Sequence, residues 1–373
     1  MKNLKLGIVT MHSVVHHGSV LQAYATQSFL EKEGYDVEII DYQYPNSWHE
    51  KHGLKVFKPS LKTKIARFFG MKPYYKGRNK IIKFQRKYYK LSMHYETPES
   101  IYKQSPIYDV YISGSDQIWN PKFTCADPVY LFGFLPKDKY IISFSSSFAC
   151  KELPEQFVEV YAKSLSKYRY LSVRENQGKQ IINSLIGRTA AVTLDPTLML
   201  NKEDWSKLLK NKEKGDKFIY LYMLDYAYNP KPYIFHLVKY YSEKMKIKVF
   251  SNVSIPESFG INYVNVSDAG IEDFLFYTCN AALVITSSFH GTAFAVNFGT
   301  PLFSVVPQKG QDDRLSSLLH NLGLDNNIID IGSPFGNLSP FYDVEREQQK
   351  LDLMRKESLN YIRIALNDIN KLV

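Results

Sequence analysis

A short polar turn, Ser287–Gly291, has the residue types and spacing needed to handle an anion. It follows an apolar run at 281–285 that is typical of a buried strand, and it precedes a helix-like run at 292–298. Backbone N–H groups at the start of a helix attract negative charge, and an imidazole beside them can exchange a proton. A capped helix with an internally bonded histidine is the alternative. The residues predicted to contact the anion are Ser288, His290, Gly291 and Thr292.

Other polar clusters also follow strand-like runs, where open parallel sheets place their ligands. The four clusters are His16-His17-Gly18-Ser19, Gly114-Ser115-Asp116-Gln117, Ser145-Ser146-Ser147 and Arg174-Glu175. Arg174 is suited to hold a carboxylate or phosphate through two parallel hydrogen bonds. Its alternative role is an internal ion pair with Glu175 or Asp195. The run Asp195-Pro196-Thr197 favours a structural turn.

Two further charged residues have open interpretations. Asp116 either caps the following turn or binds an acceptor. Arg314, after a strand-like run at 302–306, either reaches an anion or is a solvated loop charge. The sequence has no Walker loop, no complete GxGxxG and no metal-ligand spacing, so we expect no nucleotide fingerprint, no metal and no cofactor.

The elements that must position these residues alternate between strand and helix. The apolar pattern predicts buried strands at 4–11 and 35–42 and a helix at 20–32 between them. These three elements make a βαβ unit. The tail, 344–372, reads as one long helix.

A chain of 373 residues exceeds the roughly 250–300 that one core usually serves, so two domains are expected. The predicted class is α/β, with two Rossmann-like, doubly wound domains facing a cleft in a GT-B-like arrangement. The predicted parts are an N-terminal acceptor-side domain (1–209), a C-terminal donor-side domain (210–340) and a C-terminal helix (341–373). The polar run 210–217 is the expected hinge.

Composition favours a cytoplasmic globular protein. Apolar residues make up 45% and charged residues 23% of the chain. The three cysteines, Cys125, Cys150 and Cys279, form no CxxC pair, which suits a reducing compartment. No apolar stretch approaches the roughly 20 residues that span a bilayer.

The net charge of +10 comes from one segment, 46–95, which carries 14 Lys and Arg against one acid. Two helices are expected inside it, at 60–69 and 78–90, as an insertion in the N-terminal domain. A solvated helical face is one explanation. Aromatic residues among the charges favour an anionic membrane surface, and the absence of a recognised motif argues against nucleic acid.

Five segments of the sequence occur in an order that is typical of one family. They are HGSVLQAY (17–24), GSDQIWNP (114–121), SVRE (172–175), LDPT (194–197) and SFHGT (288–292). With these segments the sequence resembles the polysaccharide pyruvyl transferase family, over residues 6 to about 325. One departure is His16-His17-Gly18, where the family commonly shows Asn-Tyr-Gly.

The resemblance implies an enzyme that moves pyruvate from phosphoenolpyruvate, a co-substrate, onto two sugar hydroxyls as a cyclic ketal. His290 would be the catalytic or phosphate-contacting histidine. Arg174, with Ser288, Gly291, Thr292 and Arg314, would bind the donor. The expected acceptor is a surface-polysaccharide (exopolysaccharide or capsule) precursor, lipid-diphosphate-linked, on the inner face of the plasma membrane. Its contacts are expected from Gly18, Ser19, Asp116 and Gln117.

The sequence is also compatible with two other classes of function. A GT-B glycosyltransferase using a nucleotide sugar would have the same architecture. A non-catalytic binder of anionic lipid or nucleic acid would depend mainly on the basic segment.

Overall fold

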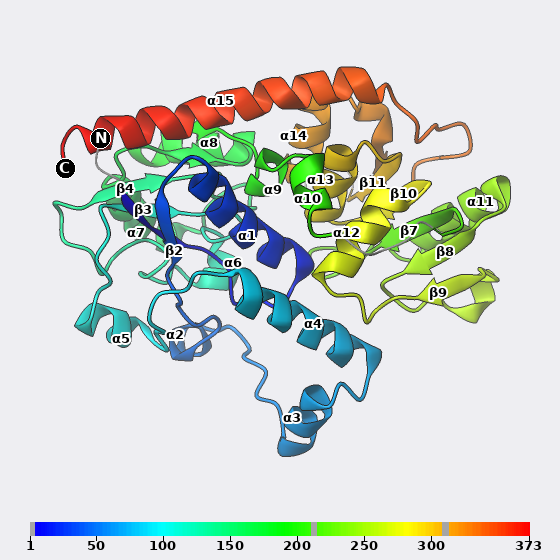
Figure 1. Ribbon diagram of the computed structural model, residues 1–373, viewed down its shortest axis with the longest axis horizontal. Helices are drawn as coiled ribbons and strands as arrows, with labels where there is room; N and C mark the ends of the chain where they lie inside the picture. Colours follow the sequence, from blue (N-terminus) through cyan, green and yellow to red (C-terminus); the bar gives the residue numbers. More distant parts are fainter. Residues whose placement is uncertain (1–3, 210–214, 308–312) are drawn as a thin grey trace. The chain divides into compact units, whose positions relative to one another are not determined.

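The computed structural model describes residues 4–209, 215–307 and 313–373 (Figure 1). The chain forms two compact units. Unit 1 comprises residues 1–58, 85–199 and 353–373, and unit 2 comprises 59–84 and 200–352. Two helices, α4 (Pro73–Tyr88) and α15 (Val344–Asn370), belong partly to each unit.

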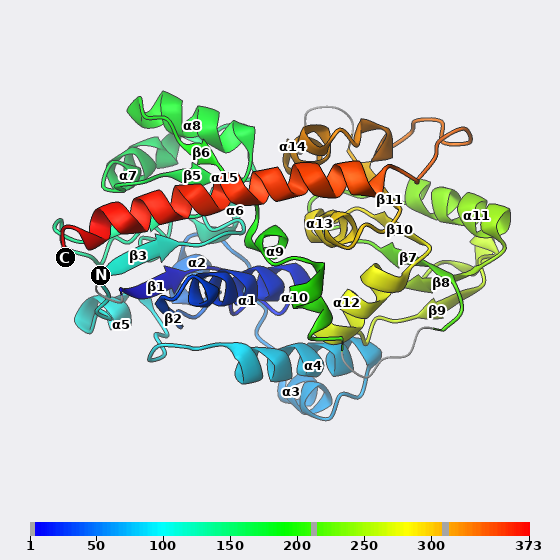
Figure 2. The same cartoon turned by 45° about the horizontal axis from the view of Figure 1, so that its top comes forward.

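Unit 1 is built on a parallel sheet whose chain order reverses in the middle (Figure 2). The order is β2-β1-β3-β4, and β1 pairs in parallel with both β2 and β3. The sheet's topological switch point therefore lies between β1 and β3. The strands are β1 (Lys5–Val9), β2 (Asp36–Ile39), β3 (Val110–Ser113) and β4 (Tyr140–Ser143). A two-stranded parallel pair, β5 (Ser172–Val173) and β6 (Ala191–Val192), joins β4 through isolated bridges.

The helices of unit 1 cover this sheet and enclose an aromatic-rich core. Trp119, Tyr130 and Tyr168 are among its largest buried side chains. Burial on both faces explains the mainly apolar sequences of β3 and β4, whereas burial alternates along β2. The helices are α1 (His17–Lys32), α2 (Ser47–Lys51), α5 (Pro98–Lys103), α6 (Pro121–Thr124), α7 (Glu155–Leu165), α8 (Asn176–Ile186) and α9 (Pro196–Met199).

Unit 2 contains a six-stranded sheet in the order β12-β11-β10-β7-β8-β9, with every pair parallel. Its chain order reverses between β7 and β10, so the switch point lies there. The strands are β7 (Phe218–Tyr222), β8 (Lys248–Ser251), β9 (Tyr263–Asn265), β10 (Leu283–Thr286), β11 (Leu302–Val306) and β12 (Ile328–Asp330).

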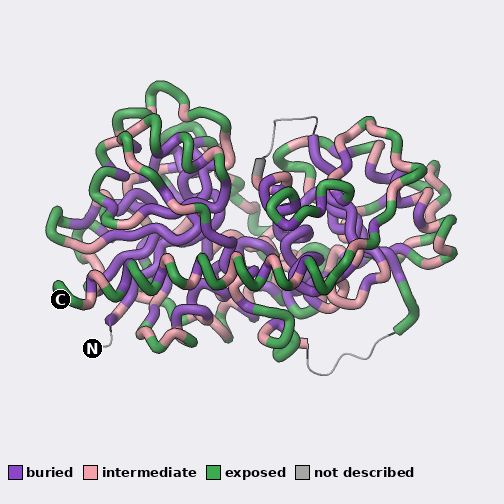
Figure 3. Tube along the Cα trace, turned by 90° about the horizontal axis from the view of Figure 1, so that it is seen from above, coloured by how far each residue is buried: buried purple, intermediate pink, exposed green. Residues whose placement is uncertain are grey.

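Helices also flank the sheet of unit 2, and the buried trace gathers at the centre of each unit (Figure 3). The core of unit 2 collects apolar side chains from β7, β10, β11 and α11. The helices are α3 (Leu61–Phe68), α10 (Lys202–Ser206), α11 (Tyr233–Met245), α12 (Ile271–Asn280), α13 (Phe289–Phe298) and α14 (Asp313–Leu322), with 3₁₀ turns at Glu257–Phe259 and Asp325–Asn327.

The predicted α/β class with two Rossmann-like domains is confirmed. The domain boundaries differ from those expected. The chain passes between units after Met199, and residues 59–84 of the basic segment group with unit 2 rather than with the N-terminal domain. Packing explains the second difference, because Lys80 pairs with Asp268 and Asp273, both of unit 2. Most of the expected hinge, 210–214, lies outside the described residues.

Candidate functional site

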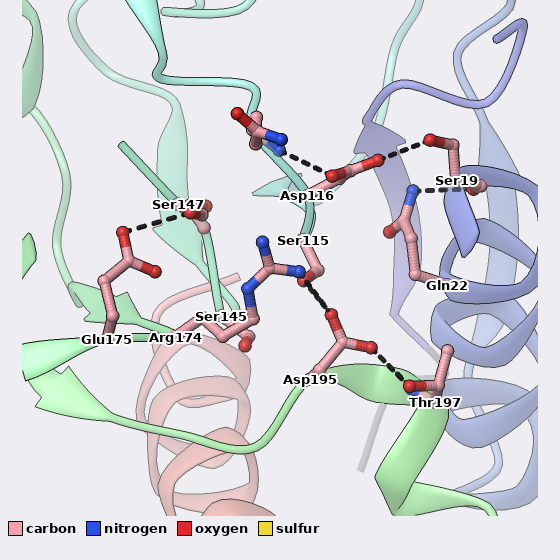
Figure 4. A network of polar contacts seen from close by, with 12 residues as sticks. Ser19, Gln22, Ser115, Asp116, Ser145, Ser147, Arg174, Glu175, Asp195 and Thr197 are labelled. Atoms are coloured by element: carbon pink, nitrogen blue, oxygen red, sulfur yellow. Dashed lines mark hydrogen bonds and ion pairs between the residues drawn. The ribbon is translucent and has the colours of Figure 1, made fainter. Parts of the chain in front are cut away.

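The switch point of unit 1 is spanned by a hydrogen bond between two residues predicted to contact the acceptor. Ser19, in the first turn of α1, donates from Oγ to Asp116 Oδ2 at 2.7 Å (Figure 4). Ser19 follows β1 and Asp116 follows β3, the two strands that flank the reversal of chain order. Ligands bind at such points in open α/β sheets, so the sheet itself supports this placement.

The backbone at the ends of β3 and β4 adopts an unusual conformation. Asp116 has φ 72° and Ser145 has φ 56°, the left-handed region that non-glycine residues seldom occupy. Such conformations persist where the surroundings enforce them, and they cluster at functional sites. Asp116 Oδ1 accepts the Gln117 N–H at 2.9 Å, which fixes the direction of its carboxylate.

Gln117 and Gly18, the other predicted acceptor residues, also lie in this region. Gln117 Oε1 accepts from Asn120 Nδ2 at 2.8 Å, so that oxygen organises the loop before α6. Gly18 is buried within the first turn of α1, beside Ser19. All four predicted acceptor residues therefore gather at one edge of the unit 1 sheet.

Arg174 follows β5 and forms a buried ion pair with Asp195. Its Nη1 lies 2.8 Å from Asp195 Oδ2, and the two side chains are 2% and 0% exposed. The sequence left two roles open for Arg174, and the structure provides the internal ion pair with Asp195. The pair also fixes the direction of the Arg174 guanidinium.

Asp195, which the sequence offered as a turn residue and as one of two alternative ion-pair partners of Arg174, is a central residue of this site. Ser115 Oγ donates to its Oδ2 at 2.9 Å, and the Thr197 hydroxyl donates to its Oδ1 at 2.6 Å. The carboxylate thus connects the ends of β3 and β5 with the start of α9 (Figure 4). A buried carboxylate needs this full set of partners.

Glu175 has a similar supporting role. Its Oε1 accepts from the Ser147 hydroxyl at 3.0 Å and from two backbone N–H groups, those of Phe148 at 3.0 Å and Ala149 at 3.2 Å. In the sequence, both Ser145-Ser146-Ser147 and Glu175 follow strand-like runs, which indicated that they lie at the same edge of the sheet.

The loop between β1 and α1 is anchored by a histidine–carboxylate group. His12 Nε2 and His94 Nδ1 each lie 3.0 Å from an oxygen of Asp41. Burial raises the pKa of Asp41, but the hydrogen bonds and charges of His12 and His94 outweigh it, so the pKa lies below its ordinary value.

This anchor predicts a specific loss of stability in acid. Because the folded pKa of Asp41 lies below the ordinary value of 3.8, its contribution is complete above 3.8 and is lost as the pH falls through the folded pKa. When the pH falls from about 7 to below the folded pKa of Asp41, the free energy of unfolding should decrease more for wild type than for Asp41→Asn. Urea unfolding at a series of pH values measures this, and parallel curves for the two proteins would contradict it.

The switch point of unit 2 is held together by the hydroxyls of Thr286 and Ser287. Thr286 Oγ1 donates to the Tyr222 carbonyl at 2.6 Å. Ser287 Oγ donates to the Leu224 carbonyl at 2.7 Å and accepts its N–H at 2.9 Å. These bonds join the carboxyl ends of β10 and β7, the strands that flank the reversal.

His290 lies in the first turn of α13, directly after this junction. Ser288 is the N-cap and accepts the Gly291 N–H at 3.3 Å. The His290 ring packs edge-on against Phe289, and the residue is 6% exposed. The predicted strand–turn–helix arrangement is therefore present. An imidazole at a helix start and a switch point is placed for acid–base work beside an anion.

Gly291 is required for close packing. A Cβ there would lie 2.4 Å from Thr286 Oγ1 and 3.0 Å from the Tyr222 ring. Gly291→Ala should therefore lower the free energy of unfolding by about 1–3 kcal/mol. The matched control is Gly215→Ala, whose Cβ would meet no atom within 4 Å. Equal urea midpoints for the two variants would contradict the packing role.

The remaining predicted donor residues of unit 2 lie on α13 and α14. Thr292 is buried and its hydroxyl lies 2.5 Å from Ser304 Oγ, so it ties α13 to β11. Arg314 is half-buried in the first turn of α14, a helix that packs on α13.

The predicted site residues therefore form two groups. Ser19, Asp116 and Arg174 belong to unit 1, and His290 and Arg314 belong to unit 2. Among the described residues, no group of three or more His, Cys, Asp or Glu side chains is arranged to hold a metal ion. In residues 4–209, 215–307 and 313–373, no helix is both long and apolar enough to cross a bilayer.

Comparison with solved structures identifies the fold. A putative UDP-N-acetylglucosamine 2-epimerase from Listeria monocytogenes is 12% identical, with TM-score 0.52, covering 98% of this chain and 91% of the other. Arabidopsis thaliana UGT89C1 complexed with UDP-L-rhamnose is 9% identical, also with TM-score 0.52, covering 100% and 98%. At these identities the likeness concerns the fold alone, and it confirms the predicted GT-B-like class.

Comparison with sequences identifies the family. None of the curated protein sequences searched matches the chain. The family model described as polysaccharide pyruvyl transferase matches residues 16–308, which is most of the chain and includes Ser19, Asp116, Arg174 and His290. The chain therefore belongs to the polysaccharide pyruvyl transferase family.

Proposed function

We propose that this protein transfers pyruvate from phosphoenolpyruvate to two hydroxyls of one sugar, as a cyclic ketal. The acceptor is a surface-polysaccharide precursor of the exopolysaccharide or capsule class, carried on a lipid diphosphate. Membership of the family supports a transferase that modifies polysaccharide. The identity of the donor, the lipid carrier of the acceptor and the roles of the individual residues are what we propose.

The proposed reaction balances without an oxidant or a metal. A proton adds to the methylene carbon of phosphoenolpyruvate, which becomes the methyl group and leaves an oxocarbenium-like centre at C2. One sugar hydroxyl attacks C2, the C2–O bond to phosphate breaks, and the second hydroxyl closes the ring. The two hydroxyls release two protons. One balances the proton added to the methylene carbon, and the other goes to the departing phosphate.

His290 is the proposed acid–base residue. The observation that carries this role is its position at the start of α13, at the switch point of a parallel sheet. A helix N-terminus stabilises phosphate, and an imidazole there can protonate the donor or its leaving group. Arg314, at the neighbouring helix start, is proposed to add positive charge for the same anion.

Arg174 is the proposed ligand for the donor's negative charge, because Asp195 holds its guanidinium in a fixed direction. Asp116 and Ser19 are proposed to bind acceptor hydroxyls. A carboxylate held by a backbone N–H and a hydroxyl is suited to accept hydrogen bonds from a sugar.

The test is incubation of the purified protein with phosphoenolpyruvate and a galactoside-containing oligosaccharide. Phosphate release equal to the gain of one pyruvate ketal in the product's mass supports the proposal. The rival is nucleotide-sugar transfer, since similar folds include a protein solved with UDP-L-rhamnose. Release of a nucleoside diphosphate from an activated sugar, with no consumption of phosphoenolpyruvate, would favour that rival.

A further inference from the structure

Helix α3 and its flanks expose an unusual amount of apolar surface. We call residues 59–76 the α3 platform. No side chain of α3 itself is buried. Leu61, Ile65 and Phe68 are 72%, 47% and 78% exposed, and their spacing places them along one face of the helix. Phe69, Met71 and Tyr74 extend this exposed apolar set. A contiguous exposed apolar patch marks an interaction site.

The α3 platform also carries charge of a single sign. Between Pro59 and Lys76 the sequence has five Lys and Arg and no acid. Four of these, Lys62, Lys64, Lys72 and Lys76, are exposed. The partner of this surface must therefore offer negative charge together with an apolar region.

The structure separates the α3 platform from the rest of the basic segment. Outside it, several cations already have anionic partners, because Lys58 pairs with Glu50, Lys80 with Asp273 and Lys90 with Glu31. The apolar face of α4 is also used within the fold, since Ile81 and Phe84 are buried. The α3 platform therefore combines exposed lysines with exposed aromatic residues.

The α3 platform is joined to the rest of unit 2 through α4, beside which α3 lies (Figure 1, Figure 2). Asn79 of α4 donates from Nδ2 to the Arg67 carbonyl at 2.6 Å, which holds the end of α3. Gly77 lets α4 approach the backbone of 267–269, where a Cβ would lie 3.0 Å from the Ala269 oxygen. Lys80 then bonds Asp273 at 3.1 Å. The exposed side chains are thus presented by an anchored element.

We propose that the α3 platform docks this protein on an anionic lipid bilayer. Phe68, Phe69 and Leu61 enter the headgroup–acyl boundary, and the surrounding lysines contact anionic headgroups. A second copy of the chain fits this surface less well, because two platforms would bring ten positive charges together without an acid. Nucleic acid would leave the apolar side chains exposed. The inference does not depend on the proposed reaction.

The test is co-sedimentation of the full chain with vesicles of phosphatidylcholine alone or mixed with phosphatidylglycerol. Wild type should bind the mixed vesicles, and added salt should weaken this binding. Two variants should each bind at least about ten-fold more weakly. One is Phe68→Ser with Phe69→Ser, and the other is Lys62→Gln with Lys64→Gln and Lys72→Gln.

Matched controls use exposed residues elsewhere. Phe341→Ser replaces an aromatic residue that is 64% exposed, and a triple Lys→Gln variant at Lys137, Lys163 and Lys167 removes the same charge. Both controls should bind like wild type, and unchanged melting temperatures for all variants show that folding is intact. Three results would overturn the proposal: equal binding to neutral vesicles, undiminished binding by both platform variants, or a dimer in sedimentation velocity that Phe68→Ser with Phe69→Ser abolishes.

Discussion

His290→Ala is expected to lower kcat for pyruvyl transfer by about 10²-fold or more while leaving the protein folded. The magnitude is that of a lost general acid–base group. His290 is placed at a helix start by the Ser288 cap, and the cap involves the Ser288 and Gly291 atoms rather than the imidazole. The measurement is steady-state phosphate release from phosphoenolpyruvate with acceptor present.

The matched control is His320→Ala, which removes an exposed histidine from α14 of the same unit. It should retain wild-type kcat. His290→Gln separates chemistry from packing, because it keeps a polar side chain that cannot transfer a proton, and its kcat should fall about as far as that of His290→Ala. A His290→Ala enzyme with wild-type kcat would remove this histidine from the mechanism.

Arg174→Lys is expected to lower kcat/KM for phosphoenolpyruvate by roughly 10- to 10²-fold, because lysine cannot replace a guanidinium held in a fixed direction. Asp195→Asn should have a similar effect on kcat/KM, and should also lower the free energy of unfolding by about 3–5 kcal/mol, since it leaves Arg174 buried without its counter-charge. Initial rates over a range of phosphoenolpyruvate concentrations and urea unfolding measure the two effects.

A double variant distinguishes a donor ligand from a structural ion pair. Arg174→Met with Asp195→Asn removes both buried charges and keeps an oxygen to accept from Thr197. Stability should recover toward wild type, while kcat/KM should stay low. Asp368→Asn is the control, because its ion pair with Arg169 is exposed and its loss should leave the urea midpoint close to that of wild type. Recovery of both stability and kcat/KM in the double variant would make Arg174 purely structural.

Local sequence patterns were sufficient for the elements and for the strand-end residues. The alternation of apolar runs and helical spacing predicted the βαβ opening and the strand before His290. The helix that follows begins at Phe289 rather than at 292, so His290 lies in its first turn and not in the predicted polar turn. These features depend on neighbours in the chain, and hydrophobic periodicity reports them directly.

Contacts between distant segments could not be predicted in the same way. The sequence offered both Glu175 and Asp195 as ion-pair partners of Arg174 and could not choose between them. The pairing with Asp195 depends on the end of β5 and the start of α9 lying at the same edge of the fold, which is a property of the tertiary structure. The basic segment likewise read as one insertion, whereas the Lys80–Asp273 contact assigns residues 59–84 to unit 2. Both contacts join residues that are distant in the sequence, and hydrophobic periodicity does not report such pairings.

The proposed transfer of a solvent proton to the methylene carbon of phosphoenolpyruvate can be measured directly by deuterium labelling of the product. The reaction is run in D₂O with phosphoenolpyruvate and a galactoside acceptor, and the product is examined by NMR. We expect a cyclic ketal whose methyl group carries one deuterium, formed with one phosphate per ketal, and almost none of this product with His290→Ala. Phosphoenolpyruvate left unconsumed, or a ketal whose methyl group carries no deuterium, would contradict the proposed reaction.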